Sequence, residues 1–288
     1  MQFLIAKADG STEYFKIEKL RRSLRRAGAA PEEINSIVQQ ITDELYDGIK
    51  TQEIYRLAFS LLRRSQAPIA ARYSLRRALL GLGPTGFPFE KFLAKLFAAE
   101  GYETKTGIIL EGKCAPHEID LAAYNQTSSF VAEAKFHARP GIKTDLQVAM
   151  YSYARLLDLK GKSICDSSVC AIKDFWLITN TKFTSTAEHY GECVGLKMLS
   201  WDYPIKNNLH DRIQRSQVYP ITVIPGLTSS QIALLISYDI IICRDILDNQ
   251  QVLSRLHISQ AKQEQILNEA RGVCQSKYKR QTTPTAGQ

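Results

Sequence analysis

Apolar residues recur at helical spacing through most of the first eighty positions of the chain. The pattern predicts a helix over 17–27 and a second one beginning at Pro31, a residue that suits the first turn of a helix. A third helix is expected over 51–67 and a fourth over 69–80. The inward-facing positions expected of the first three helices are Ile17, Leu20, Leu24, Ile34, Ile37, Val38, Ile41, Ile54, Leu57, Ala58 and Leu61.

Two short segments before these helices, 3–6 and 13–15, flank the turn dipeptide Asp9-Gly10 and predict a β-hairpin. At the other end, the stretch 81–88 is dense in Gly and Pro, which end helices. The sequence therefore predicts an N-terminal helical domain over residues 1–84.

The next segment, 87–204, alternates between helical and extended patterns, which is typical of an α/β domain. The predicted helices span 89–100, 143–157 and 186–194. The predicted strands span 108–110, 117–124, 130–136, 175–179 and 198–201.

Residues 205–274 are expected to form a small helical C-terminal region. Thr228 and Gln231 have the spacing of a capping box at the start of an apolar helix, and another helix is expected from Ser259. The polar tail 275–288 is predicted to be disordered.

Composition narrows the class of protein. The chain has 288 residues, 44% of them hydrophobic, and a formal charge of +8, which favours anionic partners such as nucleic acid. There is no apolar run of the roughly 20 residues that a membrane span requires and no secretory leader pattern, so a cytoplasmic protein without membrane contact is expected. The six scattered cysteines are expected to be reduced, although Cys165, Cys170, His189 and Cys193 also allow a zinc site.

The stretch 117–135 carries the clearest candidate chemistry. Two apolar-rich strands flank a polar turn, so a hairpin is expected in which Tyr124 pairs with Ser129. That register places Asp120 opposite Glu133, with Lys135 on the same face.

Two opposed carboxylates repel each other unless a cation lies between them or one is protonated. Magnesium or manganese ligated by Asp120 and Glu133 would supply that cation, and Lys135 would stabilise charge on a phosphate. The same residues also fit a purely structural hairpin in which Lys135 forms a salt bridge with the two acids.

This pattern resembles the PD-(D/E)xK nuclease superfamily, and specifically its Mrr-like type IV restriction endonuclease branch. The resemblance covers about 87–204 and implies an α/β restriction-endonuclease-like domain with a mixed sheet. It implies metal ligands at Asp120 and Glu133, with Lys135, Glu90 and Gln147 completing the catalytic site.

Several neighbouring residues have less specific signals. His137, Arg139 and Lys143 follow the last strand of the hairpin and are candidates for DNA phosphate contacts, or for an ordinary basic surface loop. Tyr151 is more typical of a core residue, and His117 of a structural histidine.

The N-terminal segment resembles the ATP-cone domain, through its hairpin, its first helix and the stretch 70–77. The resemblance implies that Lys7 and Lys19 contact the phosphates of ATP or dATP, which would act as an effector. A helical domain for docking or DNA contact is the alternative. In the C-terminal region, 224–228 followed by 240–247 resembles a helix-hairpin-helix, with a plain packing or dimerisation element as the alternative.

The sequence as a whole predicts a multidomain α/β protein that is a magnesium-dependent DNA endonuclease in restriction, defence or DNA repair, with ATP or dATP as effector. Its partners would be DNA and a nucleotide, and a homodimer is compatible with the sequence. The alternative is a nucleotide-responsive DNA-binding regulator whose nuclease fold is not catalytic.

Overall fold

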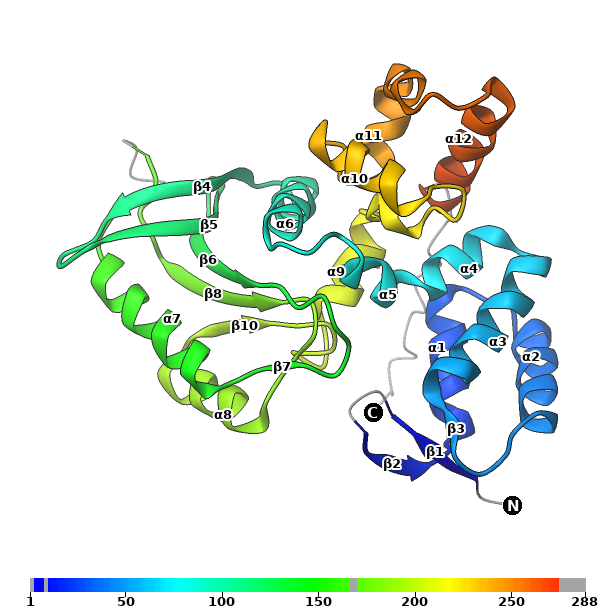
Figure 1. The fold of residues 1–288 in the computed structure, drawn as a ribbon. Coiled ribbons are helices and arrows are strands. Elements are labelled where there is room, and N and C mark those ends of the chain that lie inside the picture. Colours follow the sequence, from blue (N-terminus) through cyan, green and yellow to red (C-terminus); the bar gives the residue numbers. More distant parts are fainter. Residues whose placement is uncertain (1–2, 8–9, 166–169, 275–288) are drawn as a thin grey trace, which may run out of the picture.

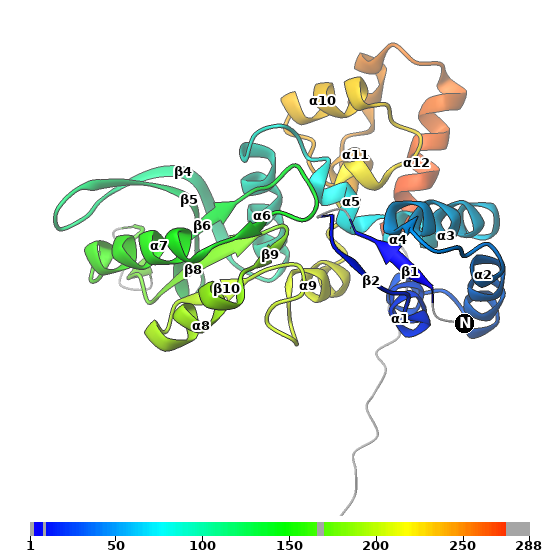
Figure 2. The ribbon, with the colours of Figure 1, turned by 60° about the horizontal axis from the view of Figure 1, so that its bottom comes forward.

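The computed structural model describes residues 3–7, 10–165 and 170–274. Figures 1 and 2 show three lobes: an N-terminal domain, a central domain built on a sheet, and a helical C-terminal region. The expected tail 275–288 and Asp9 of the expected turn lie outside the described residues. Within the described ranges, no helix is both long and apolar enough to cross a membrane.

The N-terminal domain is a helical bundle with a small sheet on one side (Figure 1). Its strands are β1 (Leu4–Ala6), β2 (Thr12–Tyr14) and β3 (Ile49–Lys50), and its helices are α1 (Ile17–Ala27), α2 (Pro31–Asp43), α3 (Thr51–Ser65), α4 (Ala67–Tyr73) and α5 (Leu75–Leu80). The hairpin β1–β2 is confirmed, and β3 adds a parallel strand beside β1 that the sequence did not reveal.

Most of the expected inward positions of this domain are buried in one core. The expectation that Ile17 faces inward is wrong, because 39% of this residue is exposed. The predicted fourth helix is also wrong as a single element, because it is divided at Ser74 into α4 and α5.

The central domain contains a five-stranded mixed sheet in the order β10-β8-β6-β5-β4. Its elements are α6 (Phe87–Ala99), β4 (Glu103–Glu111), β5 (Pro116–Tyr124), β6 (Ser129–Lys135), β7 (Lys143–Thr144), α7 (Leu146–Leu159), β8 (Asp174–Thr179), β9 (Lys182–Phe183), α8 (Ser185–Val194) and β10 (Lys197–Leu199). The pairs β4–β5 and β5–β6 are antiparallel, and β6–β8 and β8–β10 are parallel. Helices α7 and α8 cover one face and α6 the other (Figure 1).

The C-terminal region consists of helices that contact α4, α5 and α6. They are α9 (Leu209–Ser216), the 3-10 helix Ile221–Val223, α10 (Ser229–Ser237), α11 (Cys243–Asp248), the 3-10 helix Gln250–Leu256 and α12 (Gln260–Cys274). The expected capping box at Thr228 and Gln231 is confirmed at the start of α10. One continuous hydrophobic core joins α5, α6, one face of the sheet and this region. The central domain and the C-terminal region therefore share one interior.

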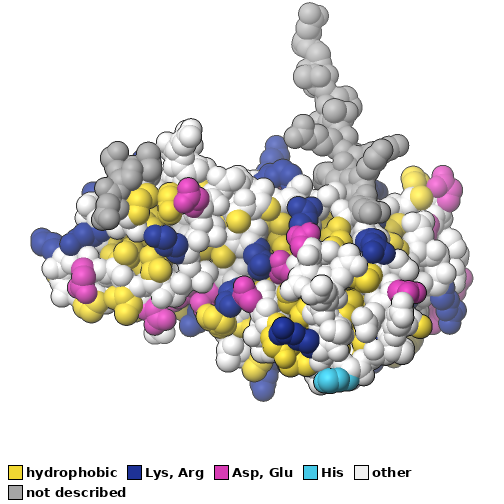
Figure 3. All heavy atoms as spheres, turned by 90° about the horizontal axis from the view of Figure 1, so that it is seen from above, with side chains coloured by type: hydrophobic (Ala, Val, Ile, Leu, Met, Phe, Trp, Pro, Cys, Tyr) yellow, Lys and Arg dark blue, Asp and Glu magenta, His cyan; other side chains and the backbone are white. Residues whose placement is uncertain are grey.

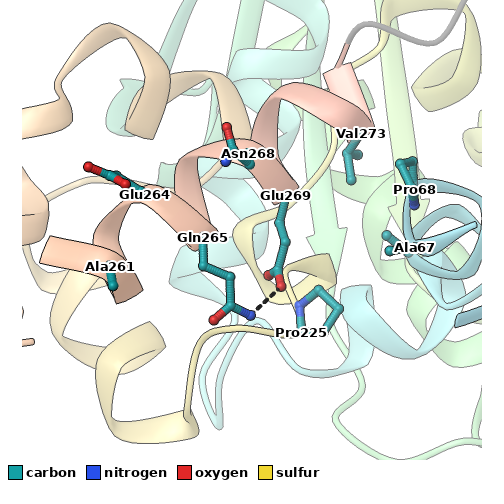
Figure 4. A pocket seen from close by; sticks show the side chains of 10 residues that line it. Ala67, Pro68, Pro225, Ala261, Glu264, Gln265, Asn268, Glu269 and Val273 are labelled. Carbon is teal, nitrogen blue, oxygen red and sulfur yellow. Dashed lines mark hydrogen bonds between the residues drawn. The ribbon is translucent and has the colours of Figure 1, made fainter. Parts of the chain in front are cut away.

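A crevice of about 510 Å³ remains between α4 and α12 (Figure 4). Glu269 on α12 points toward it and accepts a hydrogen bond from the amide of Gly226, 2.7 Å away. Gly226 lies in 224–228, the stretch that was predicted to resemble part of a helix-hairpin-helix. The backbone N–H that such a motif would offer to DNA is here already bonded to Glu269.

The expectation of six reduced cysteines is wrong for one pair, because Cys165 and Cys170 form a disulfide. Their thiols are then not available as zinc ligands. The remaining cysteines, Cys114, Cys193, Cys243 and Cys274, are free thiols.

Candidate active site and nucleotide-binding cleft

The hairpin β5–β6 has the register that the sequence predicts. Tyr124 pairs with Ser129, and the ladder continues from there to Leu121 opposite Ala132. The turn between the strands is organised by the Asn125 side chain, whose Oδ1 accepts from the amide of Ser128 at 2.9 Å. The pairing ends one position before Asp120, so the predicted opposition of Asp120 and Glu133 lies just beyond the paired residues.

Strand β5 changes face at Asp120. Ile119 packs into the core on the α7 side of the sheet, whereas Leu121 packs into the core on the α6 side. Residues two apart share a face in a regular strand, so the strand is twisted here, beside Gly107 of β4 with φ 61°. The Asp120 carboxylate accepts a hydrogen bond from the backbone N–H of Ala134 at 2.7 Å, which ties it to β6.

Glu133 is held by an arginine that sequence reasoning missed. Arg155 of α7 forms an ion pair with Glu133 and also donates to the backbone oxygen of Glu118. Only 7% of Arg155 is exposed, so this is a buried pair. A signal existed in the sequence, because Arg155 lies at helical spacing with the buried Ser152 and Leu159.

The first turn of α6 contributes a third acid. Burial, followed by repulsion from Asp120, Glu118 and Glu133, raises the pKa of Glu90 to about 7. Burial is also the main cause that raises the pKa of Asp120, and burial followed by repulsion from Asp120 raises that of Glu133. We call Glu90, Asp120 and Glu133 the acidic site.

Lys135 is exposed at the end of β6 and close enough to both Asp120 and Glu133 to favour their ionised forms. Gln147 is exposed near the start of α7. The expectation that Tyr151 belongs to the core is wrong, because 59% of it is exposed and its ring lies 5.5 Å from the Arg155 guanidinium.

The acidic site has the donor chemistry that a divalent cation prefers, although its geometry is incomplete. Carboxylate oxygens suit magnesium, and a cation would relieve the repulsion that raises these pKa values. One oxygen of Asp120 already accepts from Ala134, and one oxygen of Glu133 is bound by Arg155. Over the described part of the chain, no three His, Cys, Asp or Glu side chains are grouped closely enough to hold a metal ion. In this arrangement one oxygen each of Asp120 and Glu133 is left for a cation, so the described residues alone do not complete a metal site.

The segment after β6 runs to the side of the central domain that faces the N-terminal domain (Figure 1). The His137 backbone exchanges two hydrogen bonds of 2.9 Å with the Asn180 side chain, and its ring contacts Thr144 Oγ1 at 3.0 Å. His137 is thus used structurally, while Arg139 and Lys143 are exposed as a DNA contact requires. His117 is structural as well, with its Nε2 2.7 Å from Asp158.

A cleft of about 1120 Å³ lies between the N-terminal and central domains. Its described lining contains two carboxylates, Glu13 and Asp202, but many more cations. These are Lys7, Lys19, Arg22, Arg26, Arg72, Arg76, Arg77, Lys143 and Lys182, and we call this space the basic cleft. By contrast, the face in Figure 3 has basic and acidic side chains interspersed with apolar ones.

Both lysines predicted to bind nucleotide, Lys7 and Lys19, lie in this cleft. They converge on Glu13 of β2, with Nζ–Oε distances of 2.9 Å and 2.8 Å. Their hydrogen bonds, that of Lys19 first, lower the pKa of Glu13. Sequence reasoning missed the arginines of α4 and α5 as part of this cleft, because their positions depend on the tertiary fold.

An uncharacterized protein of Archaeoglobus fulgidus is 32% identical to this chain over 182 residues. The matched residues make up 63% of this chain and 99% of that protein. The chain belongs to the family of this archaeal protein. A crystal structure titled as protein of unknown function AF1548 shares the fold, with 31% identity and a TM-score of 0.53 over 66% of this chain and 99% of that one.

Two family descriptions match separate parts of the chain. Residues 3–80 match the ATP cone domain, so an ATP-cone domain is present at the N-terminus, as the sequence predicted. Residues 219–274 match the C-terminal domain described as AF1548-like. The ATP cone is a nucleotide-binding module, which agrees with the positive charge of the basic cleft.

Proposed function

We propose that this protein is a metal-dependent DNA endonuclease whose active site is the acidic site with Lys135. The observation that supports the proposal most is the convergence of Glu90, Asp120 and Glu133, whose pKa values are all raised by burial and, for Glu90 and Glu133, also by neighbouring acids. Perturbed carboxylates of this kind concentrate at functional sites. The protein would act in restriction, defence or DNA repair, which would use the same reaction on different DNA targets.

Each side chain would have a distinct part in the reaction. Asp120 and Glu133 would hold a magnesium or manganese ion, which lowers the pKa of bound water and neutralises charge on the scissile phosphate. Lys135 would stabilise negative charge that develops on the phosphate. Glu90, with a pKa of about 7, can accept or donate a proton near neutral pH. Gln147 would orient the site, and Arg139 and Lys143 would bind the DNA backbone.

The ion pair between Arg155 and Glu133 favours a second candidate function. A buried guanidinium neutralises Glu133 without a metal, as expected of a nuclease fold that no longer cleaves. Such a protein would be a nucleotide-responsive DNA-binding regulator.

Incubation of purified protein with supercoiled plasmid and Mg²⁺ or Mn²⁺ tests the proposal. We expect nicking by the wild type and a loss of about a thousandfold or more in Asp120→Ala, because a metal ligand is removed. Glu111→Gln is the matched control, since it removes a carboxylate from the exposed end of the neighbouring strand β4. If wild type and Asp120→Ala are equally inactive while both bind DNA, the regulator replaces the enzyme.

A further inference from the structure

The basic cleft has one wall from each of two domains. Helices α1, α3, α4 and α5 of the N-terminal domain form one wall, and 138 with 140–143, Lys182 and 201–202 of the central domain contribute to the other. We propose that a nucleoside triphosphate in this cleft is held by both walls, with its phosphates reaching Lys143, so that nucleotide and DNA compete for that lysine. The proposal that nucleotide binds both walls is based on the cleft itself. The proposal that DNA competes for Lys143 rests on the proposed function.

Two lysines of the central wall face each other in register. Strands β7 and β9 pair in parallel with Lys143 beside Lys182, and both side chains line the cleft. Like charges in cross-strand neighbours are destabilising. Among the described residues, Lys182 forms an ion pair with Asp202, whereas Lys143 forms no ion pair and has only the longer-range attraction of Glu188, which Lys182 shares. A phosphate group between the two strands would satisfy Lys143.

The opposite wall contains a buried cation with unused hydrogen-bonding capacity. Arg72 is 8% exposed, and its Nε donates to the backbone oxygen of Ala27 at 2.8 Å. Its Nη1 is shielded from water and has no hydrogen-bond partner among the described residues. Burial lowers the pKa of Arg72, and a buried guanidinium is costly unless an anion is near. Arg72 therefore adds positive charge to this wall, while its Nη1 is enclosed by the protein and does not reach the cleft.

The volume and charge of the cleft agree with a triphosphate. Its volume of about 1120 Å³ exceeds the roughly 300–1,000 Å³ typical of small-molecule sites, so a nucleotide fits with room for solvent. The crevice between α4 and α12 offers a contrast: the described residues that line it include Glu264 and Glu269 and no Lys or Arg (Figure 4). A polyphosphate would be repelled there and attracted to the basic cleft.

The central wall is also the chain segment that leaves the acidic site. Lys135 ends β6, and the residues that follow, fixed at His137 by Asn180, lead directly to Lys143. A triphosphate of about four negative charges would occupy Lys143 and weaken the positive potential that attracts DNA. Thermodynamic linkage then requires that bound DNA weakens nucleotide binding by the same factor.

Calorimetric titration of the full-length protein with ATP and dATP, in EDTA, tests the two-walled site. We expect Lys143→Ala to weaken the nucleotide Kd about tenfold, the loss of one hydrogen bond between charged groups. Lys143→Arg should retain most of the affinity. Lys105→Ala is the matched control on β4, and thermal melting checks that each variant folds. Equal Kd values for wild type, Lys143→Ala and Lys105→Ala would overturn the proposal, as would wild type that binds neither nucleotide.

A DNA-binding titration in EDTA with and without ATP then tests the competition. ATP should weaken DNA binding several-fold in the wild type and have little effect in Lys143→Ala. An unchanged DNA Kd in the wild type would overturn the competition. A protein that binds no DNA at all would refute the proposed nuclease function instead, while the nucleotide Kd comparison would still decide the two-walled site.

Discussion

The acidic site and the basic cleft lie at the two ends of one short segment, and their electrostatic requirements are opposite. In the acidic site, buried carboxylates repel each other, and Arg155 compensates part of their charge. In the basic cleft, the lysines and arginines outnumber Glu13 and Asp202. The first region concentrates negative charge and the second positive charge. The contrast agrees with the two proposed ligands, a metal ion and a nucleotide, whose proposed sites would be joined through 136–143.

The largest of the effects below concerns Lys135, the lysine beside the acidic site. Lys135→Met should reduce DNA cleavage by about 100- to 1000-fold, because the charge that stabilises the phosphate is removed. Nicking assays at saturating DNA measure this change in kcat. Lys135→Arg should recover part of the activity, and full activity in Lys135→Met would remove this lysine from the proposed site.

The next prediction tests whether Arg155 stabilises the folded protein. Arg155→Met should lower the free energy of unfolding by about 3 kcal/mol, since Glu133 loses its buried partner. Urea unfolding measures the change. The double variant with Glu133→Gln should regain much of the loss, because the unpaired charge is removed as well. Additive losses in the double variant would show that the two side chains act independently.

A smaller effect should appear in the dependence of stability on pH. The pKa of Glu90 in the folded protein, about 7, lies above its ordinary value of 4.5, so its contribution to stability is complete below pH 4.5 and is lost as the pH rises through 7. In EDTA, the wild-type Tm should therefore fall between pH 5 and pH 8, and Glu90→Gln should fall less. Identical profiles would mean that neither burial nor the neighbouring acids raise the pKa of Glu90 in the folded protein.

The smallest expected effect concerns nucleotide binding in the basic cleft. Glu13→Gln should tighten ATP binding about threefold, because Lys7 and Lys19 no longer engage a partly exposed carboxylate. Calorimetry with ATP measures the Kd, and Glu18→Gln on the exposed part of α1 is the matched control. A weaker Kd in Glu13→Gln would show that the lysines need this acid to position them.

Local patterns were sufficient to predict much of the fold. The register of β5–β6 follows from a four-residue turn and two apolar strands, and the bounds of α1 follow from its periodicity. The break at Ser74 has no strong local signal, because neither Gly nor Pro marks it.

The electrostatic setting of the candidate site could be predicted only in part. Asp120, Glu133 and Lys135 are close in sequence and share a hairpin, so their proximity could be inferred from spacing. The approach of Arg155 depends on how α7 packs on the sheet, and the basic cleft depends on the placement of two domains. Such contacts join residues distant in sequence, and single-sequence patterns carry little information about them.

The core shared by α6, the sheet and the C-terminal region has a practical consequence for dividing this protein. A chain cut near 204 would leave the α6 side of the sheet uncovered, and that bare apolar surface would favour aggregation. The N-terminal domain has a largely separate interior, around the buried residues of α1 and α2. The smallest portion expected to remain folded without the cone is thus the central domain together with the C-terminal helices, starting near 75 because α5 contributes to their interior.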